Sequence, residues 1–494
     1  MLALSRPARI ALVVLVAVVA AAHMLRFTVA VDDAFIAFRS ARNWASHGVP
    51  EYNPGTREWV PTSLAWVALL AGLDRVLPWS LPVIAQLLGG LCGVATIVLL
   101  AVAFPAAGGA GLVAAALCAV SAAWAAWPLS GMETAACALA ITAAAAAALR
   151  ARQPSGARWA WGAGLAAGAC ALIRPDGVLA LPMVLVAVAT GREWGRVARV
   201  LAGFAVVVMP AAAYLLATFG TVLPVSYYAK VEGLANLSHG LAYLARVAGA
   251  LHAYAALPFI AAALVARPSR AAAALALAFA AAWSASIAVE GGDFMAYGRF
   301  LHPVWPLCVL AAALGLAAIV RAASSVPVRM GALAMGLALG VAWAWPSVRG
   351  PDRRSYEAGG VEELARQAIG RYLAAHYPPE AGLAVKPAGI IPFYSGMHAI
   401  DFFCLTDLRA ARTGTFVPDA WPGHQRMNAA RIHDVAPRVV ILEARLYPLG
   451  SLPPPNVTDP NQGRTWLEDP RAADYEPRQV EVLPGLWMDL FERR

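Results

Sequence analysis

Charged residues are scarce in this sequence: they make up only 14% of its 494 residues, whereas 60% are hydrophobic. This balance, with a mean hydropathy of +0.62, excludes a soluble globule, a disordered chain and a collagen-like rod. Cysteines are also few. Six are scattered along the chain without a CxxC pair, so neither a disulfide framework nor a thiolate zinc site is indicated. The composition predicts a membrane protein.

The net charge of +9 does not indicate a nucleic-acid partner, because the basic residues lie mostly in short loops between apolar segments. We therefore predict no nucleic-acid binding. The first apolar run lacks a clear signal cleavage site and is expected to be retained as a helix. Stretches of membrane-spanning length predict about eleven transmembrane helices, near 9–29, 81–103, 109–128, 132–149, 158–173, 177–190, 199–219, 240–265, 271–289, 301–320 and 330–347.

The segment 62–77 is short and carries Asp74 and Arg75, so it fits either a span or an interfacial helix. The interfacial interpretation is favoured, because the arginines of the short loops then all fall on one side of the membrane. That side is predicted to be the cytoplasm, and it includes the N-terminus. Since the alanine-rich composition is compatible with a high-GC bacterium, we expect a multi-pass protein of the bacterial inner (cytoplasmic) membrane.

The last 150 residues differ in composition, since they hold most of the acids and many of the prolines. We predict a transmembrane module over 1–348, with its first outer loop and interfacial helices at 31–78. An extracytoplasmic (periplasmic) α/β domain is predicted over 349–494, called the tail below. Residues 361–377 are expected to be helical, and GLAVKPAG, HAIDFF and RVVILEA are typical of short strands. The tail either covers a site or grips a glycan, or it is a structural cap.

Polar clusters far apart in sequence all reach the membrane face opposite the arginine-rich loops, and they predict a site assembled from several helix ends. Asp32 and Asp33 follow the first helix; such paired carboxylates can act as a general base or share a divalent cation. The alternative is a helix N-cap. No cofactor is certain, and Mg²⁺, Mn²⁺ or Ca²⁺ are the ions considered.

The turn EGGDFMAYGRFLHP places Asp293, Arg299 and His302 within ten residues. A guanidinium at headgroup depth can bind a phosphate with two parallel hydrogen bonds, although an interfacial anchor paired with Asp293 is an equal alternative. His302 more often satisfies a backbone contact than binds a metal. Tyr228 and Lys230 in PVSYYAK fit either the site or an aromatic belt with a basic flank.

Three further groups have both a functional and a structural interpretation. Arg174 and Asp176 lie in a tight turn, where self-pairing is slightly favoured. Glu133 lies between two apolar helices and either caps one or contacts substrate. Tyr52, Asn53 and Trp59 offer aromatic faces and an amide, which are groups that bind sugars. The aromatic belt at a membrane interface uses the same residue types, so either interpretation fits.

The sequence contains six motifs in this order along the chain: DDAFIAFRSARNWASHG, YNPG, SGMET, IRPDG, PVSYYAK and GGDFMAYGRFLHP. In these motifs and in their order, the sequence resembles the GT-C class of membrane glycosyltransferases, which use polyprenyl-phosphate sugars as donors. The match is closest to the branch containing mycobacterial terminal arabinofuranosyltransferases. GIIPFYSGMHAIDFFCLTD and the downstream PGH are similar to that branch's extracytoplasmic domain, so the resemblance covers nearly the whole chain. It departs at WVPTSLAW (59–66), where the branch reads roughly GYTNPLW; this leaves the donor sugar and acceptor open.

The resemblance implies a multi-pass α-helical GT-C fold and a role for each cluster. An aspartate of the first outer loop acts as base or positions the acceptor; Asp32 is our first choice and Asp33 the second. Outer basic residues hold the lipid phosphate, and the candidates are Arg299, Lys230, Arg174 and His302. The candidate substrate-binding residues are Tyr52, Asn53, Trp59, Glu133, Tyr228 and Asp293.

The predicted function is an inverting sugar transfer from a polyprenyl-phosphate donor to a cell-envelope glycan or glycolipid acceptor on the extracytoplasmic face. The sugar is arabinofuranose or another pentose or hexose, and no nucleotide is needed. Two alternatives are a flippase or transporter of lipid-linked sugars and a glycan ligase that uses a polyprenyl diphosphate. A transporter usually needs charges near the membrane midplane and access to both faces.

Overall fold

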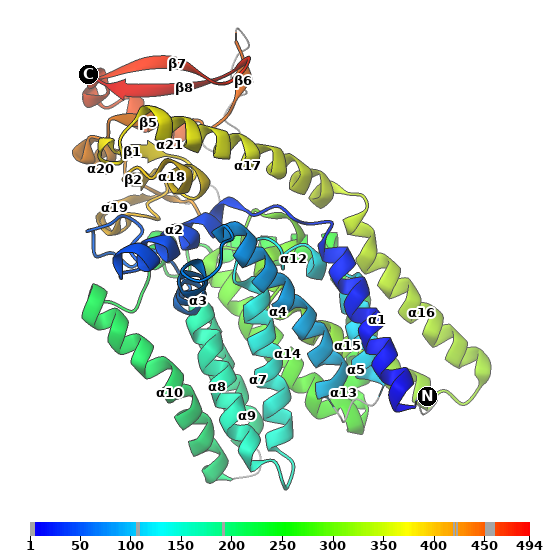
Figure 1. The fold of residues 1–494 in the computed structure, drawn as a ribbon. Coiled ribbons are helices and arrows are strands. Elements are labelled where there is room, and N and C mark those ends of the chain that lie inside the picture. Colours follow the sequence, from blue (N-terminus) through cyan, green and yellow to red (C-terminus); the bar gives the residue numbers. More distant parts are fainter. Residues whose placement is uncertain (1–4, 105–108, 190–192, 418–419, 421–422, 450–459) are drawn as a thin grey trace.

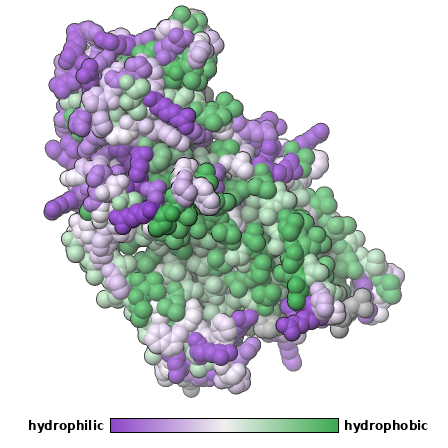
Figure 2. Space-filling view, viewed as in Figure 1, coloured by the Kyte–Doolittle hydropathy of each residue, from purple (hydrophilic) through white to green (hydrophobic). Residues whose placement is uncertain are grey.

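A computed structural model describes residues 5–104, 109–189, 193–417, 420, 423–449 and 460–494 of the chain. A bundle of long helices lies below the tail, which contains a β-sheet (Figure 1). Figure 2 shows apolar residues over the middle of the bundle and polar residues over the tail and at the opposite end of the bundle. An apolar band of this kind is typical of a protein that lies in a bilayer.

All the predicted spans contain helix, but several are short or broken. Within the described ranges, seven helices are long and apolar enough to cross a membrane, or eight if α12 and α13, bent by 71°, form one span. Residue 190, the predicted end of span 177–190, lies outside the described residues. The bundle consists of α1 (Arg6–Met24), α4 (Leu81–Ala103), α5 (Ala110–Val120), α6 (Ala122–Ala125), α7 (Thr134–Ala151), α8 (Ala157–Ile173), α9 (Ala180–Ala189), α10 (Trp194–Phe219), α12 (Leu237–Ala250), α13 (Leu257–Val265), α14 (Arg267–Glu290), α15 (Trp305–Ala322) and α16 (Val326–Ala344).

Local backbone preferences shorten two of the predicted spans. Ser121 is extended (φ −72°, ψ 128°) and divides the segment 109–128 into α5 and α6. Arg174 is extended (φ −146°, ψ 141°) and ends α8, since proline at 175 disfavours the helical conformation of the residue before it. Because 177–190 then starts with a 3₁₀ turn, its α-helix is only ten residues long.

Small side chains build the centre of the bundle. The apolar stretches of α7 and α15 are each 72% buried, against 11% for α1 and 17% for α10. Alanine dominates the sequence of α7, and small residues let neighbouring helices approach closely in a membrane. The outer helices α1 and α10 therefore present their apolar side chains outward, as expected for a surface in contact with lipid.

The first outer loop supplies the layer between bundle and tail. It contains α2 (Asp32–His47) and α3 (Leu64–Asp74). We expected α2 to lie on the bilayer; its Phe35 and Phe38 are buried inside the protein, where both rings contact Phe393 of the tail. The eleven-residue α3 is too short to cross a bilayer alone, in agreement with a non-spanning role for 62–77.

The tail is an α/β domain that begins with the long helix α17, which crosses the top of the bundle (Figure 1). Its main sheet has the strand order β2-β1-β5-β8-β6, and β7 also pairs with β8. Strand β1 is parallel to β2 and β5, whereas β8 is antiparallel to β5, β6 and β7. Strands β3 and β4 form a separate antiparallel pair. The elements are α17 (Pro351–His376), β1 (Leu383–Val385), α18 (Ile390–Ser395), β2 (Ala399–Asp401), α19 (Leu408–Thr413), β3 (Thr415–Phe416), β4 (Arg426–Met427), α20 (Ala429–Val435), β5 (Val439–Ile441), β6 (Tyr447–Pro448), α21 (Pro460–Leu467), β7 (Tyr475–Leu483) and β8 (Leu486–Arg493).

Most of the elements predicted for the tail are found. Strands β1, β2 and β5 lie in the three segments predicted to be strands, and 361–376 is the second part of α17. All three strands are buried, and apart from Asp401 at the end of β2 their residues are apolar, which is why a single sequence reveals them. The hairpin β7–β8 was missed. Six of the nine positions of β7 are exposed, so its sequence lacks a continuous apolar run.

A buried arginine joins α2 to the tail. Arg39 is 2% exposed, and its guanidinium donates to the carbonyl of Pro392, to that of Met397 at 2.7 Å and to that of Tyr52 at 2.6 Å. It also donates to Asn53 Oδ1 at 3.0 Å. No carboxylate is among these partners, so the buried charge is stabilised by oxygen dipoles and by the Tyr52 ring, whose centre lies 4.7 Å from the guanidinium carbon. This arrangement requires the tail to be docked.

We predict that Arg39→Met destabilises the docked tail strongly. Each buried carbonyl left without its donor costs about 1–3 kcal/mol, so the midpoint of thermal unfolding in detergent should fall by several degrees. Arg75→Met is the control, because exposed Arg75 also donates to two carbonyls, those of Ala45 and Trp44. Equal midpoints for the two variants would contradict the role given to Arg39.

Candidate active site

An ion-pair cluster lies where the bundle meets the tail. The guanidinium of Arg299 contacts Asp33 Oδ2 through its Nη1 at 2.6 Å and Asp293 Oδ2 through its Nε at 2.8 Å. Arg299 is only 4% exposed by its side chain, whereas Asp33 is 30% exposed. The structure thus brings together two polar segments 266 residues apart, as the prediction of an assembled site requires.

An unusual turn directs Arg299 into this cluster. Tyr297 and Gly298 have φ of +59° and +65°, and this left-handed conformation is uncommon for a bulky residue such as Tyr297. Two hydrogen bonds hold it: the Tyr297 hydroxyl donates to the Pro346 carbonyl at 3.0 Å, and its N–H donates to Asp352 at 3.0 Å. Strained backbone that neighbouring groups hold in this way is frequent at functional sites.

Asp33 and Arg299 each favour the charged form of the other. Burial by itself would raise the pKa of Asp33, but Arg299 and then Lys230 lower it below its ordinary value. Burial would lower the pKa of Arg299, yet Asp293 and Asp33 raise it. Lys230 ends α11 (Val225–Lys230), so it brings a second cation from a different part of the chain.

Asp32 points to the tail and is fully hydrogen bonded. Its two carboxylate oxygens each accept an N–H at 2.8 Å, from Gly389 and from Ile390 at the start of α18. A Cβ at Gly389 would lie 1.9 Å from the Asp32 carbonyl oxygen, so only glycine allows this approach. Both oxygens of Asp32, our first choice for the base, thus serve the junction, whereas Asp33, the second choice, contacts Arg299.

Arg174 and Glu133 form a second group of buried charges beside the cluster. Arg174 contacts Asp176 at 2.9 Å and Glu133 at 3.4 Å, and its side chain is 10% exposed. Arg174 and Asp176 therefore pair with each other within the turn, and Glu133 is an added partner of Arg174. Arg174 thus has as many carboxylate partners as Arg299, but its partners are Asp176 and Glu133 rather than Asp33.

The other residues predicted for the site lie outside the cluster. His302 is 1% exposed, stacks on Trp124 with ring centres 4.4 Å apart and places Nδ1 3.1 Å from the Ala123 carbonyl. Trp59 is buried against Phe219. These contacts belong to the packed interior.

Tyr52, Asn53 and Tyr228 connect the first outer loop and α11 to the tail. The Tyr52 hydroxyl donates to the Ala388 carbonyl at 2.6 Å. Asn53 exchanges two hydrogen bonds with the backbone of Ala399, at 2.8 and 3.0 Å, in the manner of a strand partner. The ring of Tyr228 lies under the guanidinium of Arg412, 4.6 Å from its centre. These contacts are structural, so a sugar-binding role for the three residues is only a prediction.

The sequence alone did not identify Glu363, and it indicated His424 only as a residue of the tail that faces the membrane. Glu363 Oε1 accepts a hydrogen bond from the Asp32 N–H at 3.1 Å. The two residues are 331 positions apart in the sequence, and no motif predicts their contact. His424 lies close enough to lower the pKa of Asp33, and its ring contacts that of Phe403 with centres 4.3 Å apart. Within the described part of the chain, no three His, Cys, Asp or Glu side chains converge as a metal site. A divalent cation is therefore still only a prediction.

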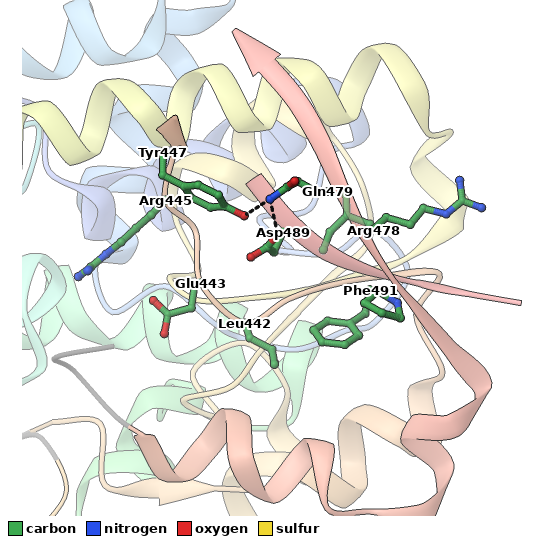
Figure 3. A pocket seen from close by; sticks show the side chains of 10 residues that line it. Leu442, Glu443, Arg445, Tyr447, Arg478, Gln479, Asp489 and Phe491 are labelled. Atoms are coloured by element: carbon green, nitrogen blue, oxygen red, sulfur yellow. Dashed lines mark hydrogen bonds between the residues drawn. The ribbon is translucent and has the colours of Figure 1, made fainter. Parts of the chain in front are cut away.

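A separate cavity of about 490 Å³ lies on the tail (Figure 3). Gln479 on β7 donates to the Tyr447 hydroxyl at 3.1 Å and to Asp489 at 3.4 Å, and Figure 3 shows all three around the cavity. None of its lining residues belongs to the Arg299 cluster. It is therefore distinct from the candidate active site.

Comparison with known proteins places the fold but not the family. A domain family of unknown function, DUF8728, matches residues 354–482, which lie within the tail. No curated protein sequence matches the chain. Among solved structures, ArnT from Cupriavidus metallidurans bound to undecaprenyl phosphate is similar, with 17% identity and a TM-score of 0.53 over 80% of this chain and 86% of that one.

A second similar structure is the archaeal oligosaccharyltransferase AglB from Archaeoglobus fulgidus, in complex with an inhibitory peptide and a dolichol-phosphate. It has 11% identity and a TM-score of 0.56 over 87% of this chain and 69% of that one. Both neighbours have the GT-C type of fold, so the predicted fold class, a multi-pass helical protein with a C-terminal α/β domain, is confirmed.

We predict that the Asp32–Glu363 junction weakens as the pH rises. Burial raises the pKa of Asp32 to about 6 and that of Glu363 to about 8, from ordinary values of 3.8 and 4.5. The folded protein therefore binds more protons than the unfolded chain between about pH 4 and pH 8, and this contribution to stability is lost as the pH rises through that window.

Glu363→Gln tests this directly, since the amide oxygen can still accept the Asp32 N–H without a charge. Thermal unfolding midpoints measured from pH 5 to pH 9 should fall less steeply in the variant than in the wild type. Parallel curves for the two proteins would show that this pair does not carry the pH dependence.

Proposed function

We propose that the chain is a membrane glycosyltransferase that takes a sugar from a polyprenyl-phosphate donor. The observation that carries the proposal is the Asp33–Arg299–Asp293 cluster with Lys230 beside it, at the junction between bundle and tail. Two cations and a part-exposed carboxylate are the groups that such a transfer needs: the cations for a departing phosphate, the carboxylate for the attacking hydroxyl. The undecaprenyl phosphate and dolichol-phosphate bound to the structural neighbours agree with this donor class.

The chemistry is an inverting displacement at the anomeric carbon. The acceptor hydroxyl loses its proton to Asp33 as its oxygen forms the new bond to that carbon. The bond between the same carbon and the phosphate oxygen breaks, and polyprenyl monophosphate leaves with the electron pair. Arg299 and Lys230 stabilise the negative charge on the departing phosphate, and they are already in place before the reaction.

The ion pair between Asp33 and Arg299 makes binding and activation depend on each other. Without substrate, the Asp33 carboxylate is paired with Arg299, and its pKa is lowered, so Asp33 is a weak base. A donor phosphate competes for Arg299 and Lys230. Once the phosphate holds these cations, the charges that lower the pKa of Asp33 are neutralised, and Asp33 becomes a stronger base next to the reacting centre.

The sugar and the acceptor rest on the sequence resemblance. We propose arabinofuranose or another pentose or hexose as the donor sugar and a cell-envelope glycan or glycolipid as the acceptor. The arginine-rich short loops support an orientation with the N-terminus in the cytoplasm and the tail on the extracytoplasmic side of a bacterial inner membrane. The donor lipid then reaches the cluster from the outer leaflet.

The test compares Asp33→Asn with Asp32→Asn in the purified protein, with several polyprenyl-phosphate sugars as donors. Asp33→Asn should reduce the transfer rate by about 10²–10⁴-fold, the usual contribution of a general base. Its unfolding midpoint should fall less than that of Asp32→Asn, because Asp293 still pairs with Arg299. Asp32→Asn should lower the midpoint, because an Asn side chain offers only one acceptor to two N–H groups. An inactive but stable Asp32→Asn beside an active Asp33→Asn would reverse the assignment.

The released lipid separates the proposed reaction from its rivals. A monosaccharide transferase releases polyprenyl monophosphate, a glycan ligase releases the diphosphate, and a flippase releases neither. The similarity to an oligosaccharyltransferase makes the ligase the rival to test first. One cluster with two nearby cations fits a monophosphate, since a diphosphate carries more charge to neutralise.

A further inference from the structure

The helix that carries Lys230 is packed into the tail rather than into the bundle. In α11, Val225 and Ala229 are 1% and 4% exposed and belong to the same apolar core as Ala410 and Ala411 of α19. Lys230 is the last residue of α11, and its charge lowers the pKa of Asp33. The position of one phosphate-binding cation is therefore set by the tail.

One side chain of the tail contacts both the end of α11 and the segment that follows it. Arg426, on β4, is 9% exposed. Its Nη2 forms an ion pair with Glu232, its Nε donates to the Ala229 carbonyl at 3.4 Å, and its Nη1 donates to the Gly414 carbonyl at 2.9 Å. Arg426 thus binds the last turn of α11 on one side and the tail backbone on the other.

These contacts act on Lys230 in two ways. The Ala229 carbonyl is directly before Lys230 and lies at the C-terminal end of α11, where a cation also interacts favourably with the helix dipole. Glu232 lies two residues beyond Lys230, and an unpaired carboxylate there would compete with a phosphate for the ammonium group. Arg426 neutralises Glu232 and leaves Lys230 to Asp33 and its ligand.

We propose that Arg426 is a positioning residue for the donor site: it fixes α11 and neutralises Glu232, so that Lys230 faces the lipid phosphate. This inference rests on the proposed function, because it takes Lys230 as a phosphate-binding group. It also assigns the tail a part in the active site, since the tail then completes the cationic half of the site.

The binding test uses the full-length protein in detergent and undecaprenyl monophosphate as the probe. Arg426→Gln and Lys230→Gln should each raise the Kd about tenfold, the size expected for one lost charge-assisted contact. The double variant should bind no more weakly than Lys230→Gln, because Arg426 acts through Lys230. Arg426→Lys keeps the charge next to Glu232 and should recover part of the affinity.

Arg438→Gln is the matched control, since Arg438 forms an ion pair with Glu492 elsewhere in the tail, at 3.0 Å. Its Kd should stay within twofold of the wild type. An unchanged Kd in Arg426→Gln, or a loss of about a hundredfold in the double variant, would overturn the inference, because the two residues would then act independently.

A second readout does not depend on the lipid. Lys230 and Lys386 are the only lysines of the sequence, so mass spectrometry can follow the modification of each by an amine-reactive reagent. Arg426→Gln should change the rate at Lys230 several-fold and leave Lys386 unaffected. If this change occurs but no form of the protein binds the lipid phosphate, the proposed function fails while the contact stands. If the rate at Lys230 does not change, the inference fails.

Discussion

Two neighbouring carboxylates in the first turn of α2 hold the molecule together at its functional junction. Successive side chains on a helix point in directions about 100° apart, so Asp32 and Asp33 cannot face the same partner. Asp32 accepts hydrogen bonds from the tail at Gly389, whereas Asp33 pairs with Arg299 at the edge of the bundle. The same helical turn therefore docks the tail and supplies the reactive carboxylate.

Because this turn is shared, the stability of the junction and the geometry of the site depend on each other. The charges there are largely buried, and a buried charge is tolerated only when an opposite charge or several hydrogen bonds compensate it. Arg39 is satisfied by four oxygens, three of them carbonyls, and Arg299 by two carboxylates. A phosphate that replaces one of the carboxylates on Arg299 keeps the charge paired, which makes the site suited to exchange of anions.

The fold was largely predictable, because its signals are local and strong. Apolar runs gave the helices of the bundle, and the short buried strands β1, β2 and β5 could be found in the tail. The contact between Asp33 and Arg299 could be predicted only in outline, because both segments were expected at the same face of the membrane. The roles of Asp32 and Asp33 could not be distinguished, since their different directions depend on Gly389 and Ile390, more than 350 residues away. Tyr52 and Asn53 are residue types found in sugar-binding sites, but they pack against the tail. Sequence alone could not reveal this, because their partners also lie far away along the chain.

The most direct measurement is a structure of the full-length protein with a polyprenyl-phosphate sugar bound. The account predicts that the phosphate lies between Arg299 and Lys230, that the Asp33–Arg299 ion pair is broken, and that the freed carboxylate faces the anomeric carbon. A phosphate bound elsewhere, with Asp33 and Arg299 still paired, would contradict the account.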